Sequence, residues 1–262
     1  MGFDKINWNK IIDDCYGEEK KYICTSPYLP KRFFRLCVCG VTGSGKTTDL
    51  LNLLLNKKGV YYDKIYLYAK ANDERKYKFL KDVLKDCDRK LHQKQLKKSD
   101  DPTMETSNKL TDLVPYDDID DEKINIILID DMVKEKDQDK LEDYIMRIRK
   151  KNCSFIYLTQ SFFDVPLFIR SNCDIFHIYG GEDMRKINTI HTICGIGTTK
   201  EEFRDIYEKA TANPYDFLNI DKVPPYKDGV PSTRYRRNWD SLYFNGSFIP
   251  YKYNEVGKIE AE

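Results

Sequence analysis

The sequence lacks long apolar runs and lacks an excess of either charge sign. Its apolar stretches are short, as at residues 126–129, and fall far below the roughly 20 residues that a membrane-spanning helix needs. Lys and Arg number 44 and Asp and Glu 43, so the net charge is only +1. Any contact with nucleic acid must therefore come from local basic patches and not from a global positive field. Residues 1–6 contain no apolar signal region, so we expect no export signal there.

The chain also lacks the cysteine spacing of common metal and redox motifs. Its 8 cysteines include no Cys-x-x-Cys pair, and we expect free thiols in a reducing, intracellular compartment. A set of cysteines and histidines leaves two interpretations open, a zinc quartet or packed core residues. Its members are Cys173, His177, His191 and Cys194. The chain does contain 40% hydrophobic residues with 19 Tyr and 13 Phe, which excludes overall disorder.

Apolar strand patterns alternate with helical patterns along most of the chain. Strands are expected near residues 33–39, 64–68, 124–131, 154–160, 174–179 and 216–220. Helices are expected near residues 49–56, 73–88, 137–151, 182–192 and 200–210. This alternation predicts an α/β fold with a mostly parallel central sheet flanked by helices. Ligands of such sheets bind at the carboxyl ends of the strands, so the chemistry is expected along one rim.

Residues 40–47 match the P-loop pattern G-x-x-x-x-G-K-[ST] in full, between an expected strand and an expected helix. Backbone N–H groups of such a loop turn inward around phosphate oxygens, and the helix N-terminus adds its positive dipole end. Lys46 is expected to reach the β- and γ-phosphates of ATP, and the Thr47 hydroxyl to ligate Mg²⁺. The predicted nucleotide site comprises Gly40, Val41, Thr42, Gly43, Ser44, Gly45, Lys46, Thr47 and Thr48.

Composition divides the chain into a core and two flanks. We expect an N-terminal extension over residues 1–30, a P-loop ATPase domain over 31–222 and a C-terminal tail over 223–262. A polar insertion near residues 89–123 interrupts the domain with a basic run followed by an acidic run. This insertion is either solvated surface or an element that faces DNA or another subunit.

Polar side chains end two of the buried strands. Asp130 is placed to hold Mg²⁺, which is the Walker B role, and Asp131 to orient or deprotonate the attacking water. The alternative for Asp131 is a turn or helix-cap role. Gln160 ends the next strand. In P-loop ATPases that have an extra strand between the Walker A strand and the Walker B strand, a polar residue at this strand tip lies between the residues that correspond to Lys46 and Asp130. There it would sense the γ-phosphate or hold the water, and the alternative is a plain turn residue.

Arginines supply candidates for a contact with a neighbouring subunit's nucleotide. Arg170 is the first candidate for such a finger, with a surface salt bridge as the alternative. A basic cluster at the end of the expected helix 137–151 is a second finger candidate, a DNA contact, or a set of favourable charges at a helix C-terminus. Its members are Arg147, Arg149, Lys150 and Lys151.

The tail carries basic residues interleaved with an aromatic one. This pattern suits either contact with DNA phosphates combined with stacking, or packing of the tail over the core. The residues concerned are Arg234, Arg236, Arg237 and Trp239.

Together these motifs resemble the FtsK–HerA superfamily, and within it the genome-packaging ATPases of poxviruses, other large DNA viruses, virophages and Polinton-like elements. The resemblance rests on four stretches in order, with residues 217–221 and 235–239 also similar. The four stretches are residues 40–48, 126–131, 157–163 and 166–172. The resemblance spans about residues 33–240 and implies a RecA/ASCE-like P-loop NTPase fold.

The resemblance implies a homo-oligomeric ring that hydrolyses ATP with Mg²⁺ and moves double-stranded DNA into a capsid. It assigns Mg²⁺ to Thr47 and Asp130, and it implies capsid or portal-site proteins, and no membrane, as partners. The implied location is the virus factory in the host cytoplasm, the virion, or both. Cellular members usually have Asp-Glu at the position of the Asp-Asp pair in this chain. The residues to which the resemblance assigns catalysis are Lys46, Asp131, Gln160 and Arg170.

Two other classes of function stay open. A P-loop kinase of a nucleoside or other small molecule would need no glutamine at the strand tip occupied by Gln160. A nucleotide-gated scaffold that does not hydrolyse ATP would not need an intact set of catalytic side chains. DNA-stimulated turnover would separate the motor from both alternatives.

Overall fold

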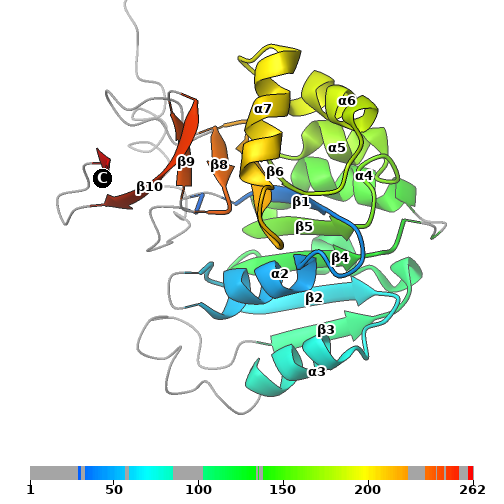
Figure 1. Ribbon diagram of the computed structural model, residues 1–262. Helices are drawn as coiled ribbons and strands as arrows, with labels where there is room; N and C mark the ends of the chain where they lie inside the picture. Colours follow the sequence, from blue (N-terminus) through cyan, green and yellow to red (C-terminus); the bar gives the residue numbers. More distant parts are fainter. Residues whose placement is uncertain are drawn as a thin grey trace, which may run out of the picture.

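The computed structural model describes residues 29–30, 33–56, 59–84, 103–133, 135, 138–223, 234–239, 241–244, 246–253 and 259–261. The parallel strands are β1 (Arg35–Cys39), β2 (Lys64–Ala69), β3 (Thr103–Ser107), β4 (Asn125–Asp130), β5 (Cys153–Thr159) and β6 (Ile175–Tyr179). The antiparallel strands are β7 (Phe217–Asp221), β8 (Tyr235–Arg237), β9 (Ser241–Phe244), β10 (Ser247–Tyr253) and β11 (Ile259–Ala261). All belong to one sheet, in the order β11-β10-β9-β8-β7-β6-β1-β5-β4-β2-β3 (Figure 1).

This arrangement confirms the predicted α/β fold with a parallel central sheet. Strand β5 pairs with β1 on one side and with β4 on the other. In this register Cys39 lies beside Thr159, and Asp130 lies beside Leu158. The carboxyl ends of β1, β5 and β4 therefore meet at one rim. Strand β5, which Gln160 follows, lies between the Walker A strand β1 and the Walker B strand β4, as expected.

Helices cover both faces of the sheet (Figure 1). Helices α2 (Lys46–Leu55) and α3 (Arg75–Asp82) pack on one face. Helices α4 (Gln138–Arg147), α5 (Leu167–Asn172), α6 (Met184–Cys194) and α7 (Lys200–Ala210) pack on the other. Successive strand side chains alternate between these two layers: Ile126 and Leu128 face α2 and α3, whereas Ile127 and Ile129 face the second layer. No described helix is long and apolar enough to cross a bilayer.

The helix ends follow local sequence signals. Thr199 caps α7 in a capping box with Glu202, since each side chain accepts a hydrogen bond from the backbone of the other residue. Asp183 caps α6 by accepting from the N–H groups of Arg185 and Lys186. Short 3-10 turns, η2 (Leu110–Asp112), η3 (Tyr116–Asp118) and η4 (Ile148–Lys151), complete the described helical segments.

Strands also form where the sequence indicated none. Strand β3 and the turns η2 and η3 lie within the expected polar insertion, and β3 pairs with β2 at the edge of the sheet. Strands β8 to β11 lie within the expected tail and continue the sheet beyond β7. The basic run at residues 89–98 and almost all of the expected N-terminal extension lie outside the described residues.

Candidate functional site

The P-loop joins the carboxyl end of β1 to the first turn of α2. Gly45 is the N-cap of α2 and has a φ of 109°, in the left-handed region where residues with a side chain are strained. Gly40 lies so close to Tyr179 that an added Cβ would come within 2.7 Å of the tyrosine Cβ. The Gly40 N–H donates to the Thr159 carbonyl at 3.2 Å, which ties the loop to the end of β5.

Lys46 lies at the centre of this rim. Its ammonium group donates to the carbonyl oxygens of Gly40 at 2.5 Å and Val41 at 3.1 Å. Burial lowers the pKa of Lys46, and the negative charges of Asp130 and Asp131 oppose that shift. The structure thus brings the predicted phosphate-binding lysine into the field of both predicted carboxylates.

Asp130, at the end of β4, is held by a residue that the sequence analysis missed. The Tyr77 hydroxyl from α3 donates to Asp130 Oδ2 at 2.5 Å, and the Tyr77 side chain is buried. Burial raises the pKa of Asp130, and the hydrogen bond from Tyr77 opposes that shift. Mg²⁺ prefers oxygen ligands, so the Asp130 carboxylate and the Thr47 hydroxyl fit the predicted ion in their chemistry. The only sequence signal for Tyr77 was its place on an expected helix.

Gln160 links the P-loop to the acid that follows β4. Its side-chain amide donates to Asp131 Oδ2 at 3.0 Å and accepts from the Thr42 hydroxyl at 3.2 Å. All three side chains are exposed, so a bound nucleotide and water can reach them. Asp131 has a φ of 51°, a left-handed conformation that Asp tolerates better than most residues. One amide therefore contacts the loop of Walker A and the second acid of Walker B.

A pocket of about 710 Å³ opens beside the P-loop. The Thr48 hydroxyl on its wall accepts a hydrogen bond from Lys76 of α3 at 3.0 Å, so α3 contributes a second side chain to the site. No sequence pattern indicated this role for Lys76. The residues from the P-loop and α2 that line the pocket are Gly43, Gly45, Lys46, Thr47, Thr48, Asp49 and Asn52.

The arginine candidates have partners within their own chain. Arg170 lies over the rings of Phe162 and Phe163, with its guanidinium 5.1 and 5.6 Å from their centroids. Arg147 forms an ion pair with Asp143 and lies over the ring of Tyr116. None of the contacts described for these two arginines reaches the P-loop, Asp130 or Gln160.

Arg149 and the tail arginines take structural positions. Arg149 forms an ion pair with Asp174, which also binds Arg35. Arg236 is buried, and Arg234 donates to the Lys222 carbonyl at 2.8 Å. These contacts support the packing interpretation for the arginines of the tail. Trp239 has a different position from these arginines, since it lines the pocket beside the P-loop.

The candidate zinc residues point in different directions. His177 Nδ1 lies 2.8 Å from Asp49 Oδ2, and His191 Nε2 lies 2.8 Å from the Thr198 carbonyl oxygen. Cys173 and Cys194 are buried in the core, where burial raises the pKa of both thiols. Within the described part of the chain, no three His, Cys, Asp or Glu side chains are grouped to hold a metal ion.

Comparison with known families decides the classification. The family model of the poxvirus A32 protein matches residues 19–207 of the 262. The chain belongs to the poxvirus A32 protein family. This membership confirms the resemblance stated from the motifs: the protein is a P-loop ATPase of the viral genome-packaging, FtsK–HerA type.

Solved structures with a similar arrangement come from viruses of Sulfolobus. One is the genome packaging NTPase B204 from Sulfolobus turreted icosahedral virus 2 in complex with AMP, at 14% identity and a TM-score of 0.49, covering 72% of this chain and 92% of that chain. Another is B204, the DNA-packaging ATPase from Sulfolobus Turreted Icosahedral Virus, at 12% identity and a TM-score of 0.48, with 72% and 92% covered. No curated protein sequence matches the chain.

Proposed function

We propose that this protein hydrolyses Mg²⁺–ATP at the rim formed by β1, β5 and β4, and uses the energy to drive double-stranded viral DNA into a capsid. The observation that carries the proposal is the Gln160 amide, which contacts both Thr42 of the P-loop and Asp131. A side chain with these two contacts can report the presence of a γ-phosphate to the acid that activates water. The proposal also retains the predicted ATPase domain over residues 31–222.

In this proposal the P-loop and Lys46 bind the phosphates of ATP. Lys46 exchanges its present bonds to the Gly40 and Val41 carbonyls for phosphate oxygens. Thr47 and Asp130 hold Mg²⁺, which neutralises charge that develops on the phosphates. Tyr77 keeps the Asp130 carboxylate oriented through its hydroxyl.

Asp131 takes the role of general base. One of its oxygens accepts from Gln160, and the other is placed to orient the attacking water and take its proton. The water oxygen then bonds to the γ-phosphorus while the bond to the bridging oxygen of ADP breaks, giving ADP and inorganic phosphate. Arg170 is proposed to stabilise this transition state in a neighbouring subunit.

The two other classes of function fit the site less well. A small-molecule kinase needs no glutamine between the two Walker strands, and here Gln160 is engaged on both sides. A scaffold that does not hydrolyse ATP has no need of Lys46, Asp130, Asp131 and Gln160 at one rim. We therefore propose a homo-oligomeric ring with a capsid or portal-site protein as its partner, acting in the virus factory or virion.

The deciding experiment measures ATP hydrolysis with and without double-stranded DNA at low and moderate salt. We expect DNA to stimulate turnover and salt to weaken the stimulation, because contacts to DNA phosphates release counterions. The matched control is Lys46→Ala, which should abolish turnover with or without DNA by removing the charge at the phosphates. Slow turnover indifferent to DNA would contradict translocation by the isolated protein, and a Lys46→Ala variant with the wild-type rate would remove the P-loop from the mechanism.

A further inference from the structure

Aromatic residues also line the pocket beside the P-loop. Tyr179, Tyr215, Phe217 and Trp239 line it, together with Asn238. These residues come from β6, β7 and the turns next to β7 and β8, so they lie far from the P-loop in sequence. The lining of the pocket therefore combines polar groups of the P-loop and α2 with aromatic rings from distant parts of the chain.

Tyr215 is placed in this pocket at a cost in backbone energy. It has a φ of 71°, in the left-handed region, and a relative exposure of 72%. An added Cβ at Gly45 would lie 3.5 Å from Tyr215 Cδ1, so the ring stands against the start of α2. Backbone strain of this kind persists only where the surrounding structure holds it, and it clusters at active sites and ligand clamps. Here a turn holds the backbone, since Asn213 donates to Asp216 Oδ2 at 3.0 Å.

Asn238 ties the turn that contains Trp239 to the turn that contains Tyr215. Its side-chain amide donates to Asp216 Oδ1 at 2.7 Å and accepts from the Phe217 N–H at 3.1 Å. Asn238 also has a positive φ, of 56°. These bonds fix the backbone next to Trp239, which lines the same pocket as Tyr215.

Trp239 is tied to the P-loop helix through a buried carboxylate. Its indole N–H donates to Asp49 Oδ1 at 3.0 Å, and His177 Nδ1 lies 2.8 Å from Asp49 Oδ2. The His177 ring is fully buried, stacks on Phe217 at 4.2 Å between centroids and meets Trp239 edge-on at 4.5 Å. Asp49 follows Thr48 directly, so the first turns of α2 hold both the phosphate-binding residues and the support of the indole.

We propose that Tyr215 and Trp239 form the binding site for the base of the nucleotide, and that the Asp49–His177 pair positions Trp239 for it. This inference rests on the proposed function, because it assumes that the P-loop holds the phosphates. The flat rings stack on the face of the base, and their larger overlap with a two-ring base favours purine over pyrimidine nucleotides. Asp49 and His177 act through the indole, because Asp49 accepts from its N–H and the His177 ring meets it edge-on.

The tryptophan content of the chain supplies a direct probe. The sequence has 2 Trp, Trp8 and Trp239, so Trp8→Phe leaves Trp239 as the sole indole fluorophore. In this background we titrate Mg²⁺–ATP and Mg²⁺–tripolyphosphate, which carries the phosphates without base or ribose. We expect ATP to change the emission of Trp239, and tripolyphosphate to compete with ATP for the P-loop while leaving the emission nearly unchanged.

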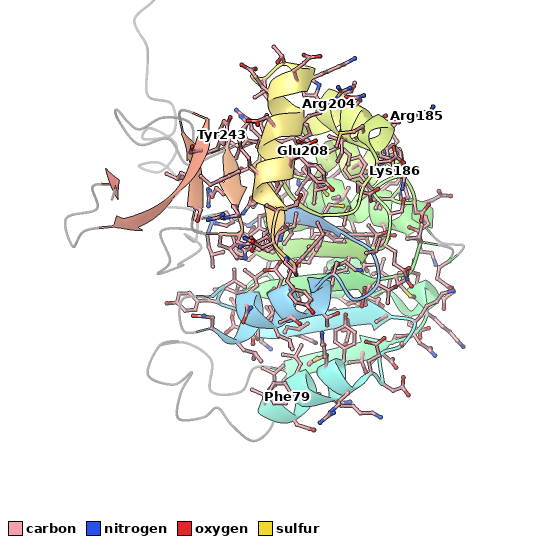
Figure 2. All side chains as sticks on the ribbon, in the orientation of Figure 1. Phe79, Arg185, Lys186, Arg204, Glu208 and Tyr243 are labelled. Carbon is pink, nitrogen blue, oxygen red and sulfur yellow. The ribbon has the colours of Figure 1, made fainter. Side chains whose placement is uncertain are left out.

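Substitution then measures the contribution of each ring. We expect Trp239→Leu and Tyr215→Leu each to weaken ATP binding about 5- to 150-fold, the range that stacking on one aromatic side chain gives. Tripolyphosphate affinity should stay at the wild-type value, and kcat at saturating ATP should change far less than KM. The matched control is Phe79→Leu, which removes another exposed ring, 53% exposed, from α3; Phe79 is not among the residues that line the pocket (Figure 2).

A double-mutant cycle tests the positioning pair. Trp239→Phe keeps a ring but loses the indole N–H, and Asp49→Asn keeps the shape but loses the charge. If Asp49 acts through Trp239, Asp49→Asn weakens ATP binding in the wild-type background and has little further effect in Trp239→Phe. A full additional loss in the Trp239→Phe background would show that Asp49 acts elsewhere.

Failure of this inference differs from failure of the proposed function. The base site alone is overturned if ATP binds and Lys46→Ala abolishes turnover, but ATP leaves the emission of Trp239 unchanged and both leucine variants keep the wild-type ATP affinity. The proposed ATPase activity stands in that case. If neither ATP nor tripolyphosphate binds the wild-type chain, both proposals fall together.

Discussion

At the scale of single residues, Tyr77 supplies a hydrogen-bond donor to the Walker B carboxylate of Asp130. The two residues are 53 positions apart, and the bond joins α3 to the end of β4. Burial would push Asp130 toward its neutral form, since burial raises its pKa. A hydroxyl that donates to the carboxylate favours the charged form, which is the form that binds Mg²⁺.

We predict that Tyr77→Phe raises the Mg²⁺ concentration needed for half-maximal ATPase activity. Without the hydroxyl the pKa of Asp130 rises further, so the acid limb of the pH–rate profile moves to higher pH. A hydrogen bond to a charged group is worth about 1.5–3 kcal/mol, which corresponds to a shift of about one to two pH units. Steady-state rates as a function of pH and Mg²⁺ check this.

The matched control is Tyr62→Phe, in which the lost hydroxyl donates to the Leu54 carbonyl at 3.2 Å. This variant removes an equally buried tyrosine hydroxyl on the same side of the sheet and should leave both profiles in place. Equal shifts in the two variants would show that Tyr77 acts only through stability. No shift in Tyr77→Phe would remove it from the support of Mg²⁺ binding.

Among the secondary-structure elements, strong local signals were predicted well. The expected helix 200–210 coincides with α7, because a capping box starts it and apolar side chains repeat along one face. Strands β4 and β5 were predicted because both faces are buried, which produces near-continuous apolar runs. Strand β3 was missed because it is a short edge strand of sequence TMETS with no buried residue and no apolar pattern.

The candidate site also contains residues with a clear sequence signal and residues without one. That the P-loop, Asp130, Asp131 and Gln160 meet at one rim could be predicted, because each lies at the carboxyl end of a recognisable strand and β5 lies between β1 and β4. Tyr77, Tyr215 and the contact between Asp49 and Trp239 could not, because they depend on packing between segments up to 190 positions apart. Sequence spacing carries no information on such contacts.

Asp174 offers a prediction about how elements are joined. Its carboxylate binds Arg35 of β1 and Arg149 of η4, next to the start of β6. We predict that Asp174→Asn lowers the free energy of unfolding at pH 7 by about 2 kcal/mol, because both arginines lose a charged partner. Chemical denaturation measures this. The matched control is Asp143→Asn, which removes an exposed partner of Arg147 and should change stability by less than about 1 kcal/mol.

The difference in the free energy of unfolding between wild type and Asp174→Asn should shrink at low pH. Burial raises the pKa of Asp174, but the hydrogen bonds from Arg35 and Arg149 outweigh burial and hold the pKa below its usual value. The stabilisation is therefore complete above the ordinary aspartate pKa of about 3.9 and declines as the pH falls below it. A difference between wild type and Asp174→Asn that grows on acidification would contradict this account.

At the scale of the whole molecule, the proposed ring would build each catalytic site from two subunits. Arg170 lies on α5 over Phe162 and Phe163, on the face of the sheet opposite α2. The ring that we propose would let a neighbour's Arg170 reach the γ-phosphate, as a head-to-tail interface brings different surfaces of two subunits together. Such a site is shared between subunits, and sharing can be tested by mixing.

We predict that mixing Lys46→Ala and Arg170→Ala subunits before assembly restores ATPase activity. Lys46→Ala alone should be inactive, and Arg170→Ala alone should bind ATP normally but lose at least about 10²-fold in rate. In a randomly mixed ring about a quarter of the interfaces pair an intact Lys46 with an intact Arg170 of the neighbour, so activity reappears there. No recovery would place Arg170 in its own chain's site or in packing on the phenylalanine rings. The same mixing with Arg147→Ala tests the second candidate, and recovery only in that mixture would assign the finger to Arg147.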